Sequence, residues 1–432
     1  MFTSDCLSLN PAGHLTVGGC DTLDLAAQYG TPLYVFDETQ LRQNCRAYVR
    51  SLERFYGGNG IALYASKAFC CKEVLRVMME EGMGNLVCSG GELYTALQVG
   101  FPMERLYFHG NNKRPKEIEM AVTHGVGRVV VDNLAELRRL DAEAARQGKK
   151  AKILLRVKPG IDAHTHDFIR TGQIDSKFGF ALETGEALEA AKAASASANI
   201  ELCGIHCHIG SQIFDAAPFT LAAEVMFGFL ARINAECGAA LQELDLGGGF
   251  GVRYDENDSP LPYEAYMEAV AAALRVKAAE YGLPMPFIAL EPGRSIPAPA
   301  GITLYTVGAV KNIPNVRSYL LTDGGMNDNP RYALYGAKYT VLNAARAGEA
   351  ASETYTVAGR CCESGDLIQE HTKVQPAKEG DVLAVLATGA YNYSMSMNYN
   401  RMARPAVVMV KDGASRIIVK AETIEELCRN DM

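Results

Sequence analysis

The chain has 432 residues, of which 48% are hydrophobic and 21% charged, a composition typical of a soluble globular protein with two or three domains. Its net charge of -8 argues against nucleic acid as the main partner, because phosphate binding requires a basic face. No apolar run approaches the roughly 20 residues that a membrane-spanning helix needs, and the first residues lack the pattern of a secretory signal. The twelve cysteines contain no C-x-x-C pair, so we expect free thiols and a cytoplasmic protein that acts on a small molecule.

The first third of the chain passes from short strands into a regular alternation. Residues 1–35 indicate strands and turns, with β-type runs at 15–17 and 32–36. A helical period follows over residues 38–56, and short apolar runs then alternate with helical segments. The apolar runs are 61–65, 85–88, 106–109, 128–131, 152–157, 202–209, 244–246 and 287–290. The helical segments between them are 72–81, 91–99, 115–124, 135–147, 181–194, 218–236 and 262–281.

Eight strand–helix units over about 250 residues predict a (β/α)8 barrel rather than an open, doubly wound sheet. The loop from 157 to 181 is long and polar, and long loops on the carboxyl side of barrel strands are usually functional. After residue 300 the chain changes to β-branched runs divided by Gly, Asn, Asp and Pro, which predict an all-β domain. We therefore expect N-terminal strands (1–35) that join this β domain, a barrel (36–298) and the β domain itself (299–432). Residues 344–353 read as an exposed loop of that domain.

Lys67 follows the first buried barrel run and is the central residue of the functional interpretation. Taken alone, a lysine at the end of a strand most simply reaches solvent. A partly desolvated lysine, however, loses its proton more easily and forms a Schiff base with a carbonyl. Active sites of barrels lie at the carboxyl ends of the strands, so the residues after the other strands decide between the two readings.

Three further polar segments follow late strands of the predicted barrel. Gly247, Gly248 and Gly249 expose backbone N–H groups in the region where barrels commonly bind phosphate, although a glycine run alone is as often a tight turn. The spacing fits neither a dinucleotide nor a Walker A motif. His206 and His208 share one face of a strand. With Cys203 and Cys207 they suggest a metal site, but these side chains do not all point to one side, and we expect no metal.

His206 is better explained as a hydrogen-bonded core residue, whereas His208 could offer a flat face to a ring. Glu291 ends an apolar strand, where it either pairs with Arg294 or accepts from a protonated ring nitrogen. An imine-forming lysine, a phosphate loop, a stacking ring and a carboxylate for a pyridinium together describe a site for pyridoxal 5'-phosphate, a cofactor that acts as an electron sink.

Five segments carry a resemblance to a known family, in the family's order and over nearly the whole chain. They begin at Tyr64, His206, Gly247, Glu291 and Cys362, and read YASKA, HCHIGSQ, GGGFG, EPGR and CESGD. These segments resemble those of the diaminopimelate decarboxylases, in the alanine-racemase-like group of pyridoxal-phosphate enzymes. The resemblance implies decarboxylation of meso-2,6-diaminopimelate to L-lysine and CO2, the last step of lysine biosynthesis.

The resemblance also implies roles for individual residues. It places the cofactor on Lys67 and against the face of His208, with Glu291 at the ring nitrogen. The residues implied to hold the phosphate or lie beside the cofactor are Ser211, Gly247, Gly248, Gly249, Gly293, Arg294 and Tyr391. The residues implied to contact the substrate are Arg294, Arg331, Tyr335, Glu363 and Tyr391. The segment 175–179 matches another part of the family pattern, inside the long loop.

Cys362 matches the proton donor of the family, and it would act with Glu363 in the active site of the partner subunit. The resemblance thus implies a homodimer with shared active sites. Cys361 is more simply a small buried hydrophobic residue. A diaminopimelate substrate carries a distal carboxylate and a distal ammonium, and arginines with Glu363 supply the opposite charges.

Three alternatives stay open at this point. A related decarboxylase for ornithine, arginine or carboxynorspermidine would need acids but no arginine at the distal end of its substrate, and such relatives carry Asp after the cysteine. An alanine racemase would have an arginine at the ring nitrogen, where this chain has Glu291. A non-catalytic pyridoxal-phosphate-binding homologue would be expected to lack Lys67 or Cys362, and both are present.

Overall fold

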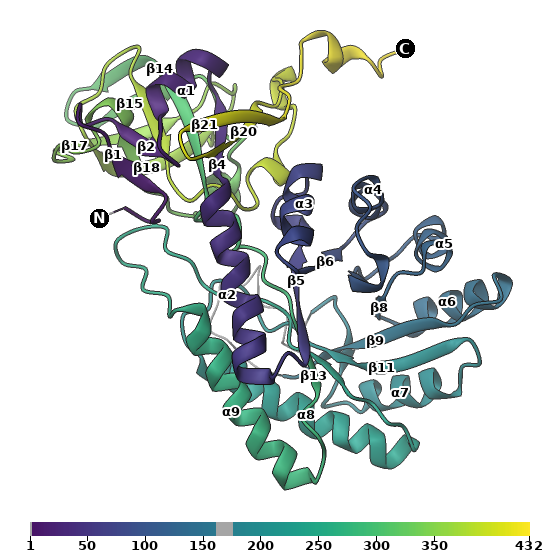
Figure 1. Ribbon diagram of the computed structural model, residues 1–432. Helices are drawn as coiled ribbons and strands as arrows, with labels where there is room; N and C mark the ends of the chain where they lie inside the picture. The colour runs from purple at the N-terminus through teal and green to yellow at the C-terminus, as the bar shows by residue number, and fades with distance from the viewer. Residues whose placement is uncertain (1, 161–175) are drawn as a thin grey trace. The chain divides into compact units, whose positions relative to one another are not determined.

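The computed structural model describes residues 2–160 and 176–432 and divides into two units (Figure 1). The first, here called the barrel unit, comprises Asn44–Gly251 and Pro260–Gly293. The second, the β unit, comprises Met1–Gln43, Val252–Ser259 and Arg294–Met432. Each unit is described by itself below. In the described part of the chain, no helix is both long and apolar enough to cross a membrane.

The barrel unit contains a closed ring of eight parallel strands. Around the ring they are β9 (Ala151–Lys158), β11 (Ile200–His206), β12 (Glu243–Asp245), β13 (Phe287–Leu290), β5 (Gly60–Ala65), β6 (Gly84–Val87), β7 (Leu106–Phe108) and β8 (Arg128–Val131). Pairing of β8 with β9 closes the ring. The predicted (β/α)8 barrel is confirmed, and each strand lies where an apolar run predicted it.

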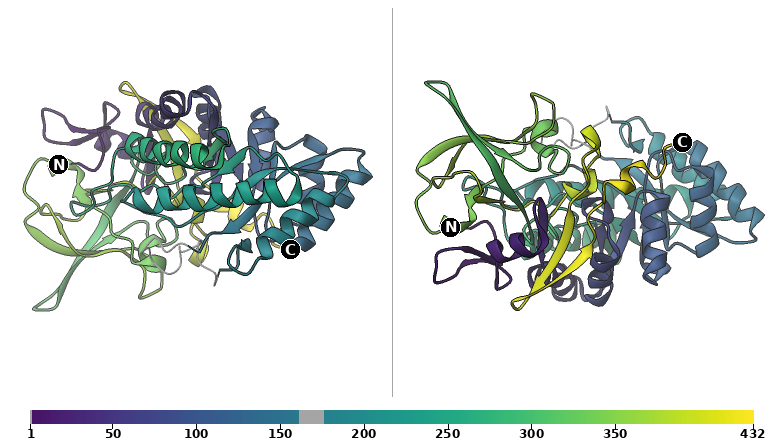
Figure 2. Two further views of the ribbon diagram at one scale, coloured as in Figure 1. Left: turned by 90° about the horizontal axis from the view of Figure 1, so that it is seen from below. Right: turned by 90° about the horizontal axis from the view of Figure 1, so that it is seen from above.

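Among the described residues, seven helices follow the strands and lie outside the ring, where α8 and α9 run side by side (Figure 2). They are α3 (Lys72–Glu80), α4 (Gly90–Gln98), α5 (Pro115–His124), α6 (Leu134–Arg146), α7 (Glu186–Ala196), α8 (Ala217–Cys237) and α9 (Tyr263–Tyr281). Local sequence fixes where several begin: Ser89 accepts from the N–H of Glu92 at 3.2 Å, and Asn133 from that of Glu136 at 2.9 Å. The helix expected from residue 181 begins only at Glu186, because β10 (Phe180–Ala181) first pairs with β9.

Apolar side chains fill the interior of the ring. The cluster comprises Leu63, Ala65, Leu86, Tyr107, Val130, Leu154 and Ala289, each at most 3% exposed. This packed interior means that chemistry can occur only at the ends of the strands. Lys67, His208 and Glu291, which were predicted for the site, follow the carboxyl ends of barrel strands.

The β unit is built on one large sheet. Its order is β18 (Leu367–Val374), β17 (Glu353–Ala358), β15 (Arg317–Thr322), β14 (Gly301–Ile313), β4 (Leu33–Asp37), β20 (Ala406–Lys411) and β21 (Ala414–Val419). β19 (Val382–Val385) pairs with β14 and with β16 (Val341–Asn343). A small sheet of β1 (Leu7–Leu9), β2 (Leu15–Val17) and β3 (Cys20–Asp21) packs its apolar residues into the same core. The prediction that N-terminal strands join an all-β domain is confirmed.

Two details of the β unit could not be read from the sequence. Residues 1–35 contain the helix α1 (Thr22–Tyr29), which begins where Asp21 accepts from the N–H of Leu23 at 2.8 Å. β18 is not recognisable from sequence because polar residues interrupt its apolar pattern. The segment 344–353 is the expected loop: it opens with the 3-10 turn Ala344–Arg346, and of its residues Ala344 alone is buried.

Candidate active site

Lys67 occupies a rigid turn at the carboxyl end of β5. The 3-10 turn Ser66–Ala68 exposes this lysine, while Ser66 and Ala68 on either side are fully buried. The Ser66 hydroxyl donates to Oδ1 of Asn85 at 2.7 Å, and the Tyr64 hydroxyl donates to the carbonyl of Phe69 at 2.8 Å. These hydrogen bonds fix the chain just before and just after Lys67. Lys67 interacts electrostatically with Glu92 and His208, so its amino group lies among the groups at the strand ends.

His208 and the glycine loop after β12 are in direct contact. The N–H of Gly248 donates to Nδ1 of His208 at 3.3 Å. Burial, with the nearby positive charge of Lys67, holds the pKa of His208 well below its usual value, so the ring is neutral. The loop bearing Ser211 joins the same group, because the N–H of Ile213 donates to the carbonyl of Gly249 at 2.9 Å.

The glycine loop has no room for side chains. A Cβ on Gly248 would lie 2.1 Å from the carbonyl oxygen of Glu291. Gly247 and Gly249 have φ values of +68° and +122°, which other residues rarely adopt. The backbone can therefore approach a ligand without hindrance. Ala65 also donates its N–H to the carbonyl of Pro292 at 3.1 Å, which ties the segment preceding Gly293 to the strand that carries Lys67.

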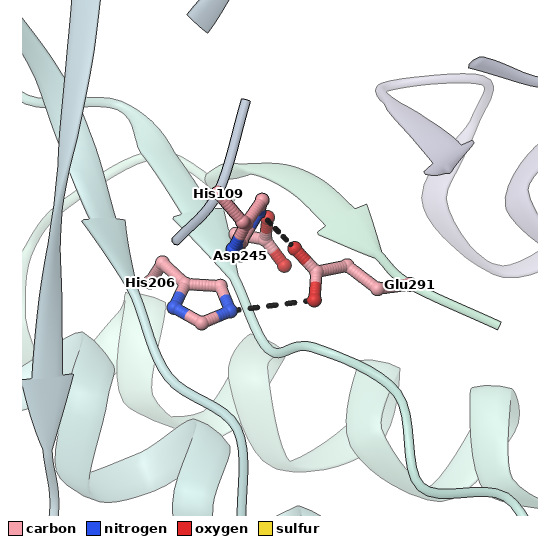
Figure 3. A group of neighbouring side chains, drawn as sticks. All are labelled: His109, His206, Asp245 and Glu291. Atoms are coloured by element: carbon pink, nitrogen blue, oxygen red, sulfur yellow. Dashed lines mark hydrogen bonds and ion pairs between the residues drawn. The ribbon is translucent and has the colours of Figure 1, made fainter. Parts of the chain in front are cut away.

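Glu291 directly follows β13 and belongs to a buried cluster of four polar side chains (Figure 3). One carboxylate oxygen, Oε1, lies 2.7 Å from Nε2 of His109, and the other, Oε2, lies 3.4 Å from Nε2 of His206. Asp245 completes the group, and its Oδ1 accepts from the N–H of Gly247 at 2.9 Å. His206 is the hydrogen-bonded core residue that the sequence suggested. The partners seen for Glu291 are imidazoles rather than the Arg294 that sequence spacing offered.

The four ligand atoms of this cluster lie within 4.8 Å of one another, as they do in many metal sites. Neighbouring ligands of a tetrahedral zinc ion, each about 2.1 Å from the metal, lie about 3.4 Å apart. The separation of 2.7 Å between Glu291 and His109 is shorter than that and is a direct contact of the two atoms. The geometry therefore favours direct contacts among these side chains, with His206 hydrogen-bonded to Glu291.

Sequence reasoning missed two members of this cluster. His109 follows β7 and Asp245 ends β12, and both sequence positions obey the rule that pointed to Lys67 and Glu291. A search for every polar residue at a strand end would have found them. The contact of His109 with Glu291, however, follows only from the closure of the barrel, because β7 and β13 are separated by β5 and β6 in the ring.

These barrel-unit residues fit a pyridoxal-phosphate group on three structural grounds. The side-chain-free loop suits a phosphate, since backbone N–H groups bind anions. The neutral ring of His208 suits stacking. Glu291 is held as an anion: burial alone would raise its pKa, but the two imidazoles outweigh that effect and hold the pKa well below its usual value.

The β unit assembles the arginines and tyrosines that the sequence singled out. Arg294 donates to the Tyr254 hydroxyl at 2.7 Å, and its guanidinium lies 5.0 Å from the centre of the Tyr391 ring. Arg331 begins the short helix α10 (Arg331–Tyr335) and lies 5.5 Å from the same ring and 5.4 Å from that of Tyr335. Tyr391 thus carries two guanidinium groups on its π system, an arrangement that keeps two cations together for an anionic ligand.

Cys362 and Glu363 lie exposed on the turn between β17 and β18. Asp366 stabilises this turn, because its buried carboxylate accepts from the N–H groups of Met326 and Cys361, each at 2.6 Å. The N–H of Cys362 donates to Oδ1 of Asn400 at 2.7 Å. Its neighbour Cys361 is buried. Two adjacent thiols therefore face opposite environments, and only that of Cys362 is presented outward.

Part of the family pattern in the long loop lies outside the described residues, namely position 175 of the segment 175–179, with most of the loop from 157 to 181. The described end of the segment contacts the barrel. The N–H of Gly179 donates to Asp132 at 2.9 Å, and the guanidinium of Arg156 lies 4.3 Å from the centre of the Phe178 ring.

Comparison with known proteins agrees with this geometry over the whole chain. Residues 38–298 match the family described as pyridoxal-dependent decarboxylase, pyridoxal binding domain. The diaminopimelate decarboxylase of Bacillus subtilis is 48% identical over 432 residues, which cover 100% of this chain and 98% of that protein. That of Staphylococcus aureus is 42% identical over 98% of both chains.

Solved structures give the same answer. The crystal structure of diaminopimelate decarboxylase from M. jannaschii in complex with L-lysine superposes with a TM-score of 0.92 at 32% identity. The match covers 100% of this chain and 99% of that one. The match covers both the barrel unit and the β unit and thus places this chain in a known group. The chain belongs to the diaminopimelate decarboxylases, a family of pyridoxal-dependent decarboxylases.

Proposed function

We propose that this protein uses pyridoxal 5'-phosphate to convert meso-2,6-diaminopimelate into L-lysine and CO2. The observation that carries the proposal is the barrel-end group of Lys67, His208, the bare glycine loop and the ionised Glu291, in a chain 48% identical throughout to a diaminopimelate decarboxylase. The bound cofactor supplies an electron sink for the bond to the departing carboxylate. The chain's own residues supply everything else.

Lys67 holds the cofactor covalently, and Glu291 binds its ring nitrogen. Gly247, Gly248 and Gly249, with Ser211, Gly293 and Arg294, hold the phosphate. His208 covers the ring face, and Tyr391 lies beside the cofactor. These assignments are supported by the contact of His208 with the Gly248 N–H and by the ionised state of Glu291.

The distal end of the substrate is bound by charge complementarity. Arg331 and Arg294 attract its carboxylate, Glu363 attracts its ammonium group, and Tyr335 lines the site. The two guanidinium groups that share the Tyr391 ring support this assignment, because they keep two positive charges together for anionic groups. Sγ of Cys362 then delivers the proton that replaces the lost carboxyl group.

The active form is a homodimer in which Cys362 and Glu363 enter the partner's active site. The exposure of both residues on a turn built by Asp366 supports this arrangement. The twelve free thiols suit a reducing compartment, and we place the protein in the cytoplasm.

Substrate preference tests the assignment. The ratio kcat/KM for meso-diaminopimelate should greatly exceed that for ornithine and arginine, which carry no distal carboxylate. Replacing Arg331 with methionine should lower kcat/KM for diaminopimelate about 10- to 100-fold, as expected when a charged hydrogen bond is lost. Cofactor affinity should stay unchanged. A wild-type preference for ornithine or arginine would contradict the substrate and retain the fold and cofactor.

A further inference from the structure

The buried cluster around Glu291 holds one histidine whose role the proposed reaction leaves open. His109 is 4% exposed, and its Nε2 is 2.7 Å from Oε1 of Glu291, closer than the 3.4 Å separation of His206 from Oε2. The two imidazole rings meet edge to face with centroids 4.8 Å apart (Figure 3). Glu291 is therefore bracketed, with one imidazole beside each oxygen.

A carboxylate held in this way can still bind a third donor. Its two oxygens offer about four lone-pair positions, and the two imidazoles with the neutral Asp245 can occupy at most three of them. A further position stays available to a ring N–H group. The bracket thus fixes the orientation of Glu291 without blocking its proposed use.

The protonation states in the cluster make Glu291 its single anion. Burial lowers the pKa of His109 to about 3 and also lowers that of His206, so both rings are neutral near pH 7. Burial, with the neighbouring charge of Glu291, raises the pKa of Asp245 well above its usual value, so Asp245 is a neutral acid. Other titratable groups that act on this site are Arg156, Asp132, Glu243, Cys88, Cys207 and His208. Two neighbouring carboxyl groups in opposite charge states are typical of active sites in which each carboxyl group has its own chemical role.

The position of His109 is itself built by a buried ion pair. Directly after His109, the carbonyl of Gly110 accepts from Nζ of Lys113 at 2.9 Å. The same ammonium group donates to the carbonyl of Val130 and to Oε1 of Glu136, both at 2.7 Å. Lys113 and Glu136 are at most 2% exposed, and a buried pair of this kind holds its surroundings in one arrangement. The turn that carries His109 is thus anchored to β8 and α6.

We propose that His109 is a positioning residue that acts through Glu291: as an uncharged donor it keeps this carboxylate an anion and oriented toward the ring nitrogen of the cofactor. The inference rests on the proposed function, in which Glu291 binds that nitrogen. The inference adds that His109, which follows a different strand, determines the protonation state and the orientation of Glu291. His206 assists from the other oxygen at longer range.

Two substitutions at one position test the idea. Glutamine at 109 can still donate an N–H group but can never carry a charge, whereas leucine can do neither. For His109→Leu, we expect the pKa of Glu291 to rise, so that the carboxylate takes up a proton as the pH falls. The dissociation constant for pyridoxal phosphate should then increase about tenfold or more between about pH 8 and about pH 6, while the wild-type value changes little. His109→Gln should stay within about threefold of wild type.

The measurements are equilibrium cofactor binding and the visible spectrum of the loaded protein, each as a function of pH. His14→Leu is the matched control, because His14 lies 2.8 Å from the carboxylate of Asp21 in the β unit and should leave both readouts unchanged. In a Glu291→Gln background, His109→Leu should cause no further change in the pH dependence. This double variant retains the test if His109→Leu alone folds poorly.

Two results would overturn the inference. One is a wild-type pH profile for folded His109→Leu. The other is a loss in His109→Gln as large as that in His109→Leu, which would show that a charged imidazole is required. Either result leaves decarboxylation by the wild-type protein intact. Failure of the proposed function would instead be seen in the wild-type protein itself, before any substitution at 109.

Discussion

Replacing Lys67 with alanine should abolish the visible absorbance band of the lysine-linked cofactor and lower turnover by about 10³-fold or more, the scale expected for loss of a nucleophilic residue. The side chain is exposed on a turn that Ser66 and Tyr64 fix independently. The free energy of unfolding should therefore change by no more than about 0.5 kcal/mol. Absorbance spectra, turnover and thermal unfolding of the variant check these three expectations.

Arginine at position 67 separates two roles of the lysine. Arginine keeps the positive charge near His208 and Glu92 but, being always protonated, forms no imine. Lys67→Arg should therefore lose the band and the activity as fully as Lys67→Ala does. A variant Lys67→Arg that retained the band would mean that another lysine carries the cofactor.

The adjacent thiols Cys361 and Cys362 provide the second large effect and its own control. Cys362→Ala should lower kcat about 10²- to 10⁴-fold, as expected for loss of an acid–base group. Cys361 is buried, and its Sγ lies 3.5 Å from Oδ1 of Asn327. Cys361→Ala should therefore cost about 1–2 kcal/mol of stability and leave kcat within a few-fold of wild type. Steady-state rates and thermal melts of the two variants distinguish these outcomes.

Mixed dimers show whether Cys362 acts across subunits. Subunits carrying Lys67→Ala and subunits carrying Cys362→Ala should each be nearly inactive alone. After they exchange, half of the dimers are mixed and each has one intact site, so about a quarter of wild-type activity should return. If both variants are nearly inactive and no activity returns after proven exchange, the site is not shared between subunits.

The barrel could be predicted because its signal is local and repeated. Each strand is a short apolar run, and strands such as β8 are buried on both faces in a parallel sheet, so they carry no competing pattern. The β unit was harder. α1 has only eight residues, and its capping residue Asp21 lies in a region of short strands. β18 alternates between buried and exposed residues too irregularly to be recognised.

The candidate site shows the same division. Lys67, His208 and the glycine loop could be found because each breaks the pattern at the end of a strand. The pairing of Glu291 could not, because the sequence offers Arg294 three residues away, and His109 becomes a neighbour only when the ring closes. Protonation states depend on this closure too. Asp245 and Glu291 are both carboxyl groups at strand ends, and only their surroundings make one neutral and the other an anion.

The most direct test of the account is the stoichiometry of the reaction. Purified protein loaded with pyridoxal phosphate should convert meso-2,6-diaminopimelate into L-lysine and CO2 in equal amounts, and the Lys67→Ala variant should form neither. Protein that shows the cofactor band but releases no CO2 from diaminopimelate, ornithine or arginine would contradict the account and indicate a non-catalytic pyridoxal-phosphate-binding protein.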